Sequence, residues 1–167
     1  IGNYAFYGCT SLPEITFPAG VTSIGSSAFE KCTSLSSIVL PEGLTAISQG
    51  AFARCSALSL VIDLPNLTTL GKDAFTLADV MRVENLGKIS SIEDAVSSNF
   101  GMFRSNVNLT FVSLPDTLTI IGNYAFYGCT TLPEITLPAG VTSIGSSAFQ
   151  GCKSLQYIRI EATTPPT

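Results

Sequence analysis

The chain repeats itself at an interval of 23 residues, and this periodicity restricts its fold more than any other feature. Five units follow one template, I-x-x-x-A-F-x-x-C-x-x-L-x-x-I-x-L-P-x-x-L/V-T-x, and two others keep only part of it. The five complete units begin at Ile1, Ile24, Ile47, Ile121 and Ile144. A period of this length predicts a solenoid, in which each unit is one turn that packs mainly on its two neighbours.

The two degenerate units begin at Leu70 and Ile92, the first one residue short and the second with about six extra residues. We therefore expect a single solenoid over residues 1–167 with about seven repeats, which start near 1, 24, 47, 70, 92, 121 and 144. Residues 1–29 and 121–149 differ at only two positions, which suggests that blocks of units were copied within a longer array.

Each unit predicts an extended segment followed by a compact one. The stretch L-x-x-I-x-L-P, as in 35–41, alternates apolar and other residues, and the proline suits a strand end because it donates no hydrogen bond. Stretches such as 20–25 predict a second, shorter strand. The polar residues before Ala28 and Phe29 resemble a helix cap, so we expect one or two helical turns there. The expected fold class is α/β, with a parallel sheet on one face and short strands and helical turns on the others.

One phenylalanine recurs at a fixed position of the template and is expected to form a continuous row inside the solenoid. The row comprises Phe6, Phe29, Phe52, Phe75, Phe103, Phe126 and Phe149. The five cysteines also share one position, and their number is odd. A row of small buried side chains is the favoured interpretation, with disulfides or a metal cluster as alternatives.

The extended motif C-x-x-L-x-x-I-x-L-P-x-x-L-x-x-I-G-x-x-A-F resembles the BspA-like class of leucine-rich repeat. The resemblance covers almost the whole chain and fails only around residues 76–101. It implies a leucine-rich-repeat solenoid from a secreted or cell-surface bacterial protein that acts in adhesion or recognition. It implies no catalytic residues, and we expect no cofactor.

Composition excludes several functions. The net charge is −4 with only eight Lys and Arg residues, which argues against nucleic acid because phosphate binding needs clustered cations. No apolar run approaches the roughly 20 residues of a membrane span, so this segment is not expected to insert into a membrane. Histidine is absent and the acidic residues are scattered, so we expect no enzyme and no metal centre. A cation site among Asp73, Asp79, Glu84, Glu93 and Asp94 is the weaker alternative to a solvated loop.

The outer face of the predicted sheet holds the candidate binding residues. Side chains on both sides of each central strand residue are expected to point outward, and they vary from unit to unit as a recognition surface would. The candidates are Leu60, Ile62, Arg82, Phe111, Glu134, Tyr157 and Arg159. The insert at 93–101 is a second candidate region, since loops on rigid arrays often carry contacts. The alternative is that free surface positions vary without consequence.

These observations favour a recognition module that binds a protein partner, such as a host matrix or cell-surface protein, through the sheet face or the insert. The alternative is a structural spacer or stalk that presents another domain.

Overall fold

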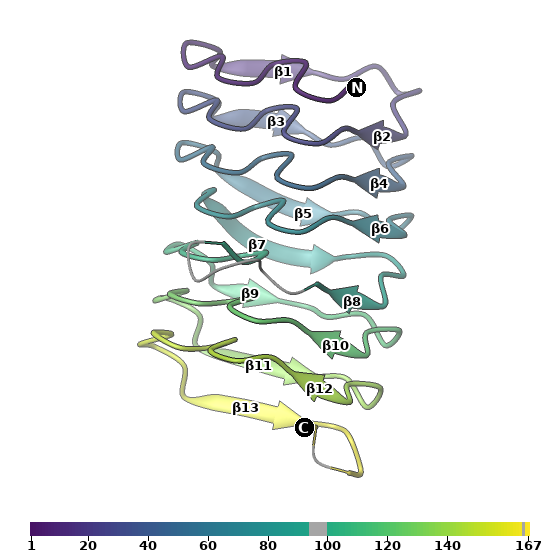
Figure 1. Ribbon diagram of the computed structural model, residues 1–167, viewed down its shortest axis with the longest axis vertical. Helices are drawn as coiled ribbons and strands as arrows, with labels where there is room; N and C mark the ends of the chain where they lie inside the picture. The colour runs from purple at the N-terminus through teal and green to yellow at the C-terminus, as the bar shows by residue number, and fades with distance from the viewer. Residues whose placement is uncertain (94–99, 165) are drawn as a thin grey trace.

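A computed structural model describes residues 1–93, 100–164 and 166–167, and over these residues the chain forms strands and turns without a helix. The chain winds as a stack of similar turns with its two ends at opposite ends of the stack (Figure 1). No helix that could cross a membrane occurs in those three ranges. The protein is therefore a solenoid, as the 23-residue period predicts.

Two series of parallel strands run along the stack. The odd-numbered strands form one face, called here the sheet face, and the even-numbered strands form a second face (Figure 1). The odd series is β1 (Glu14–Thr16), β3 (Ser37–Val39), β5 (Leu60–Asp63), β7 (Val80–Asn85), β9 (Phe111–Val112), β11 (Glu134–Leu137) and β13 (Tyr157–Ile160). The even series is β2 (Ser23–Ile24), β4 (Ala46–Ile47), β6 (Thr69–Leu70), β8 (Ser91–Ile92), β10 (Ile120–Ile121) and β12 (Ser143–Ile144).

All strand pairs are parallel, which confirms the predicted parallel sheet and the second short strand. The ladder of the sheet face is nevertheless divided into β1–β3, β5–β7–β9 and β11–β13. In the regular turns, a backbone hydrogen bond to the preceding turn forms just before the strand, two residues ahead of its central residue. Ser36 N–H donates to the Pro13 carbonyl, and Gln156 N–H donates to the Pro133 carbonyl. Before β11 this position is Pro133 itself, which has no N–H to donate toward β9.

The expected helical turns around the Ala-Phe pair are wrong, because backbone N–H groups there alternate between two kinds of acceptor. The N–H groups of Ser27, Phe29 and Lys31 donate to carbonyls of the following turn, at 2.8 to 2.9 Å. The N–H groups between them donate to carbonyls three residues back, as in β-turns. An α-helix would direct every N–H four residues back, so this segment cannot be helical.

Backbone dihedrals give the reason for the tight turns. Ser27 and Lys31 have positive φ angles of 50° and 64°, and the equivalent positions of the other complete units also have positive φ. Two left-handed residues four positions apart interrupt any right-handed helix and produce successive turns instead. Gly8, Gly50, Gly128 and Gly151 occupy some of these positions, and glycine adopts this conformation without strain.

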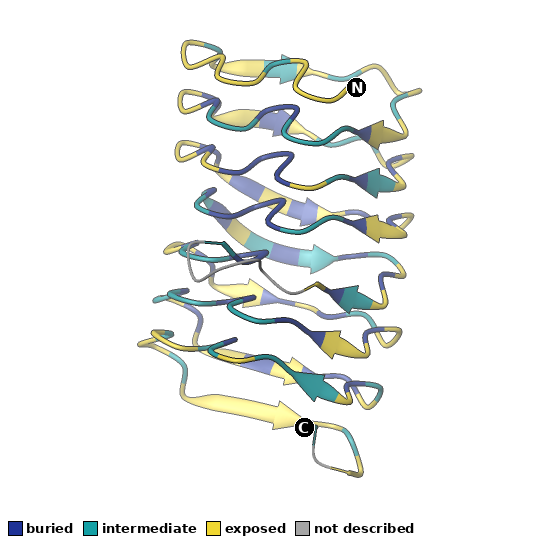
Figure 2. Ribbon diagram, viewed as in Figure 1, coloured by how far each residue is buried: buried dark blue, intermediate teal, exposed yellow. Residues whose placement is uncertain are grey.

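The phenylalanine row lies inside the stack as predicted. Consecutive rings from Phe6 to Phe149 are stacked, with centroid distances from 5.0 to 5.9 Å and nearly parallel planes. The five inner phenylalanines are fully buried, whereas Phe6 and Phe149 are partly exposed in the outermost turns. Figure 2 shows this gradient, with buried residues in the middle of the stack and exposed residues at both ends.

Candidate functional site on the sheet face

Strand register places five of the predicted binding residues on the surface of β7 to β13. Arg82 is paired with Phe111, Glu134 with Tyr157, and Thr136 with Arg159. Tyr157 is 68 % exposed and Phe111 is 38 % exposed, which is high for aromatic side chains. Glu134 and Arg159 are exposed, and Arg82 is partly exposed.

The expected outward orientation of Leu60 and Ile62 is wrong, because both side chains are buried, at 3 % and 0 % exposure. Val61 and Asp63 face outward in their place, and the register with β7 shifts at two points within β5. The unit from Ile47 has one more residue before its Leu-Pro pair than the unit from Ile24. This added residue exchanges the inward and outward positions along β5. That spacing is the sequence signal that identifies Val61 as the exposed residue.

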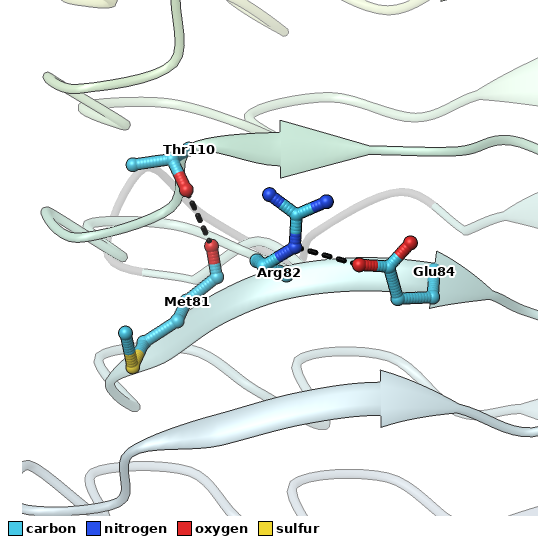
Figure 3. Close-up of polar contacts among 4 residues, drawn as sticks. All are labelled: Met81, Arg82, Glu84 and Thr110. Atoms are coloured by element: carbon cyan, nitrogen blue, oxygen red, sulfur yellow. Dashed lines mark hydrogen bonds and ion pairs between the residues drawn. The ribbon is translucent and has the colours of Figure 1, made fainter.

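A stacked arginine occupies the centre of the face. The Arg82 guanidinium lies 4.5 Å from the centre of the Phe111 ring, and its Nε donates to a Glu84 carboxylate oxygen 2.6 Å away. Figure 3 shows Arg82 and Glu84 side by side on β7, and beside them the Thr110 hydroxyl donates to the Met81 carbonyl at 3.2 Å. The arginine is thus held between an aromatic ring and a carboxylate, a geometry that favours a cation.

Two open hollows lie beyond this arginine. The first has a volume of about 570 Å³ and is lined by Glu134, Thr136, Tyr157 and Arg159 with the residues between them. The second, of about 240 Å³, extends over β9 and β11, where the ladder is open, and includes Phe111, Asp116 and Glu161. Thr136 lines both, so the hollows adjoin one another on the sheet face.

A third hollow, of about 510 Å³, lies at the other end of the sheet face, between the ends of β1 and β3. Its lining is mainly apolar and includes Phe17, Val39 and Pro41, with Glu42 at one side. Val39 is 76 % exposed. No arginine and no tyrosine lines this hollow, so it differs chemically from the pair near β13.

The insert at 93–101 lies largely outside the described residues, since only Glu93, Phe100 and Gly101 of it are described. Its end is fixed to the preceding turn, because Gly101 N–H donates to the buried carboxylate of Asp73 at 2.8 Å and the Gly101 carbonyl accepts from the Thr76 hydroxyl. Burial raises the pKa of the Asp73 carboxyl above its ordinary value. Glu93 forms an ion pair with Lys72 at 3.8 Å.

The other acidic residues of the weaker cation-site hypothesis are used separately. Asp79 accepts from the Asn108 side-chain amide, and Glu84 pairs with Arg82. Asp94 lies outside the described residues. Among the residues that are described, no group of three or more potential metal ligands occurs.

The cysteine row has a role that composition alone does not reveal. All five thiols are free, and four of them donate to the carbonyl of the phenylalanine in the preceding turn, at 3.0 to 3.1 Å. In the degenerate unit from Ile92, Asn106 takes this role, since its side-chain amide donates to the Phe75 carbonyl at 2.9 Å. Burial raises the pKa of the Cys55 thiol to about 12 and also raises the pKa of the Cys129 thiol, so both stay protonated and unreactive.

Comparison with known proteins relates the chain to one repeat family. The family described as "BspA type Leucine rich repeat region" matches residues 1–101 and 96–165, in six copies. A leucine-rich repeat protein from Bacteroides ovatus is 31 % identical, with a TM-score of 0.85 over 95 % of this chain and 40 % of that protein. No curated protein matches.

Two other solved structures share the fold. The leucine-rich repeat protein of T. pallidum is 31 % identical, with a TM-score of 0.62 over 96 % of this chain and 63 % of its own. A leucine-rich repeat protein from Eubacterium ventriosum is 27 % identical, with a TM-score of 0.53 over 93 % of this chain and 45 % of its own. The chain therefore spans less than two thirds of each of these relatives.

Proposed function

Because the chain belongs to the BspA-type leucine-rich repeat family, we propose that it is a non-catalytic recognition module of a secreted or cell-surface bacterial protein. Its partner is a protein, of the host matrix or of a neighbouring cell, that docks on the sheet face. The related solved structures, all from bacteria, support a bacterial source.

One observation carries this proposal: aromatic and arginine side chains gather on the half of the sheet face that is formed by β7 to β13. Phe111 and Tyr157 are both exposed there, beside Arg82 and Arg159 and around two adjoining hollows. Tyr and Arg are the residues most often found to dominate protein–protein affinity. The outward residues of β1 and β3 are Glu, Thr, Ser and Val, so the two halves of the face differ.

Binding of the folded chain to immobilised host matrix proteins tests the proposal. We expect binding at micromolar concentrations, and we expect the double variant Phe111→Ser, Tyr157→Ser to weaken it by at least about tenfold. Tyr4→Ser is the matched control, since Tyr4 is 63 % exposed but lies in a turn segment away from the sheet face. Absence of binding, or equal losses in both variants, would contradict recognition by this face.

The insert and the spacer hypothesis give different results in the same assay. If a Gly-Ser replacement of residues 94–99 abolishes binding while the double variant retains it, the insert is the contact region. If neither the Gly-Ser replacement nor the double variant affects attachment of the whole protein to its target, the array acts as a spacer or stalk that presents another domain.

A further inference from the structure

We propose that Glu134 and Tyr157 form a binding site for a lysine or arginine side chain of a partner polypeptide. This inference rests on the proposed function and specifies the chemistry of the partner. It follows from three observations: Glu134 and Tyr157 have no side-chain partner among the described residues, a cluster of the same kinds of group on β7 and β9 contains its own cation, and the charge around β11 and β13 is negative.

The pair itself lies at one level of the sheet face. Glu134 and Tyr157 are register partners on adjacent parallel strands, and both side chains are exposed. Within the described residues neither side chain forms a hydrogen bond, an ion pair or a ring contact. A carboxylate and an aromatic ring therefore stand next to each other with no cation between them.

A cluster of the same kinds of group that contains its own cation lies on the same face. Arg82 on β7 is stacked on Phe111 of β9 at 4.5 Å and is paired with Glu84 at 2.6 Å. Here the chain supplies the cation, the ring and the carboxylate from its own residues. Glu134 and Tyr157 supply a carboxylate and a ring as register partners of each other, and no cation of the described residues is paired with either of them. We therefore expect the cation to come from another molecule.

The charges around the pair favour a cationic partner. The two adjoining hollows are lined by three carboxylates, Asp116, Glu134 and Glu161, and by one cation, Arg159. Arg159 is the register partner of Thr136 and forms no ion pair with Glu134 in the described structure. Five of the other cations, Lys31, Arg54, Lys72, Arg104 and Lys153, belong to the turn segments.

The shape of the site favours a polypeptide. The hollows are open to solvent and together extend over β9, β11 and β13, so they suit an extended segment whose side chains reach different strands. The exposed Phe111 ring provides an apolar contact next to the cation site. We therefore expect a segment that carries Lys or Arg next to an apolar residue.

The test uses a short fluorescein-labelled peptide in which Arg and Leu alternate, and the same peptide with Glu in place of Arg. Fluorescence anisotropy should detect binding of the Arg peptide to the full chain. Added salt should weaken this binding because it screens exposed charges. Glu134→Gln and Tyr157→Leu should each weaken binding by about two- to fivefold. The Glu peptide should not bind.

The internal near-repeat provides a matched control. Glu14 occupies the position of Glu134 in the equivalent unit, but its register partner is Ser37 instead of an aromatic residue. Glu14→Gln removes the same charge and should leave the affinity for the Arg peptide unchanged. Circular dichroism and thermal unfolding of each variant establish that it is folded.

Three results would overturn the inference: no binding of the Arg peptide, equal losses in Glu14→Gln and Glu134→Gln, or stronger binding of the Glu peptide. These outcomes differ from failure of the proposed function. A matrix protein whose binding depends on Phe111 but is unaffected by Glu134→Gln would preserve recognition by the sheet face and remove only the cation site. Binding of the Arg peptide without binding of any matrix protein would support the cation site and contradict the proposed function.

Discussion

Arg54 illustrates how single residues accept strain in the turn segments. Its φ angle is 62°, whereas Gly8, Gly128 and Gly151 occupy the same position of their units with φ of 71°, 72° and 79°. A left-handed conformation costs a non-glycine residue about 1–2 kcal/mol. The arginine side chain is exposed and forms no polar contact within the described residues, so nothing in the fold requires it.

We therefore predict that Arg54→Gly stabilises the chain. Relief of the strain is partly offset by the greater freedom of glycine in the unfolded chain, about 0.4–1 kcal/mol, which leaves a net gain of about 0.5–1 kcal/mol in the free energy of unfolding. Urea denaturation measures this difference. Arg54→Ala keeps the strain and should leave stability nearly unchanged, and an equal gain in both variants would show that removal of the arginine side chain is the cause.

The buried thiol of Cys55 gives a prediction about pH. Its pKa rises from an ordinary value of 9.0 to about 12 on burial, so the folded chain holds the proton more tightly than the unfolded chain. The contribution of the thiol to stability is complete below pH 9 and declines as pH rises from 9 toward 12, by up to about 1.4 kcal/mol per pH unit. The stability difference between the wild type and Cys55→Ala should therefore narrow above pH 9 in denaturation series, and a constant difference would contradict the assignment.

At the scale of strands, Pro133 removes one hydrogen-bond donor from the open step between β9 and β11. The equivalent residues Ser36 and Gln156 donate to the preceding turn, and proline cannot. The sequence LPEIT supplies the proline, and the same five residues in the first unit place Pro13 in the first described turn, with no described turn on the side toward which Pro133 faces β9. The two prolines therefore have the same local sequence and different neighbours.

We predict that Pro133→Ser gains a hydrogen bond to β9 that Pro13→Ser cannot gain. Both variants lose the same restriction of the unfolded chain, so this contribution cancels in the comparison. Pro133→Ser should be more stable than Pro13→Ser by about 0.5–1.5 kcal/mol, the usual net value of one hydrogen bond. Denaturant unfolding of the two variants checks the difference, and equal stabilities would mean that the gap between β9 and β11 has another cause.

The same elements show how far sequence reasoning extends. Strand positions and the phenylalanine row follow from periodic apolar residues, which depend only on local alternation and stacking. The prediction of helical turns is wrong because the choice between a helix and successive β-turns depends on where each N–H donates. In the segments around the Ala-Phe pairs, every second N–H donates to the next turn of the solenoid. Glycine at the left-handed positions was the local sign of this difference.

The candidate site shows the same limit. Glu134, Tyr157 and Arg159 are predicted correctly on the sheet face because their units keep the spacing of the template. Arg82 and Phe111 are predicted correctly because the alternation around Val83 and Val112 survives in the two degenerate units. Leu60 and Ile62 were misplaced because one added residue inverts the two sides of a strand. The sequence does not predict the hollows, because side chains from separate units form them. The smaller hollow also lies over β9 and β11, where the ladder is open.

On the scale of the whole molecule, each turn is stabilised mainly by its two neighbours. Phe75 is fully buried and is stacked between Phe52 at 5.5 Å and Phe103 at 5.9 Å. Phe6 has one stacked neighbour in the row, Phe29, and is partly exposed. In a stack with nearest-neighbour coupling, removing a central ring weakens the contacts on both of its sides, whereas removing a terminal ring weakens only one.

We therefore predict that Phe75→Ala and Phe6→Ala differ in kind as well as in size. Phe75→Ala should cost about 3–5 kcal/mol, as for other large-to-small changes in a core, and Phe6→Ala clearly less because it empties a partly exposed position. Hydrogen exchange with mass spectrometry should show faster exchange on both sides of residue 75 in the first variant. In the second variant, faster exchange should be confined to the turns next to Phe6, because the coupling that stabilises each turn passes only between neighbours. Uniformly faster exchange along the chain in both variants would mean that the solenoid unfolds as one cooperative unit, and the nearest-neighbour description would fail.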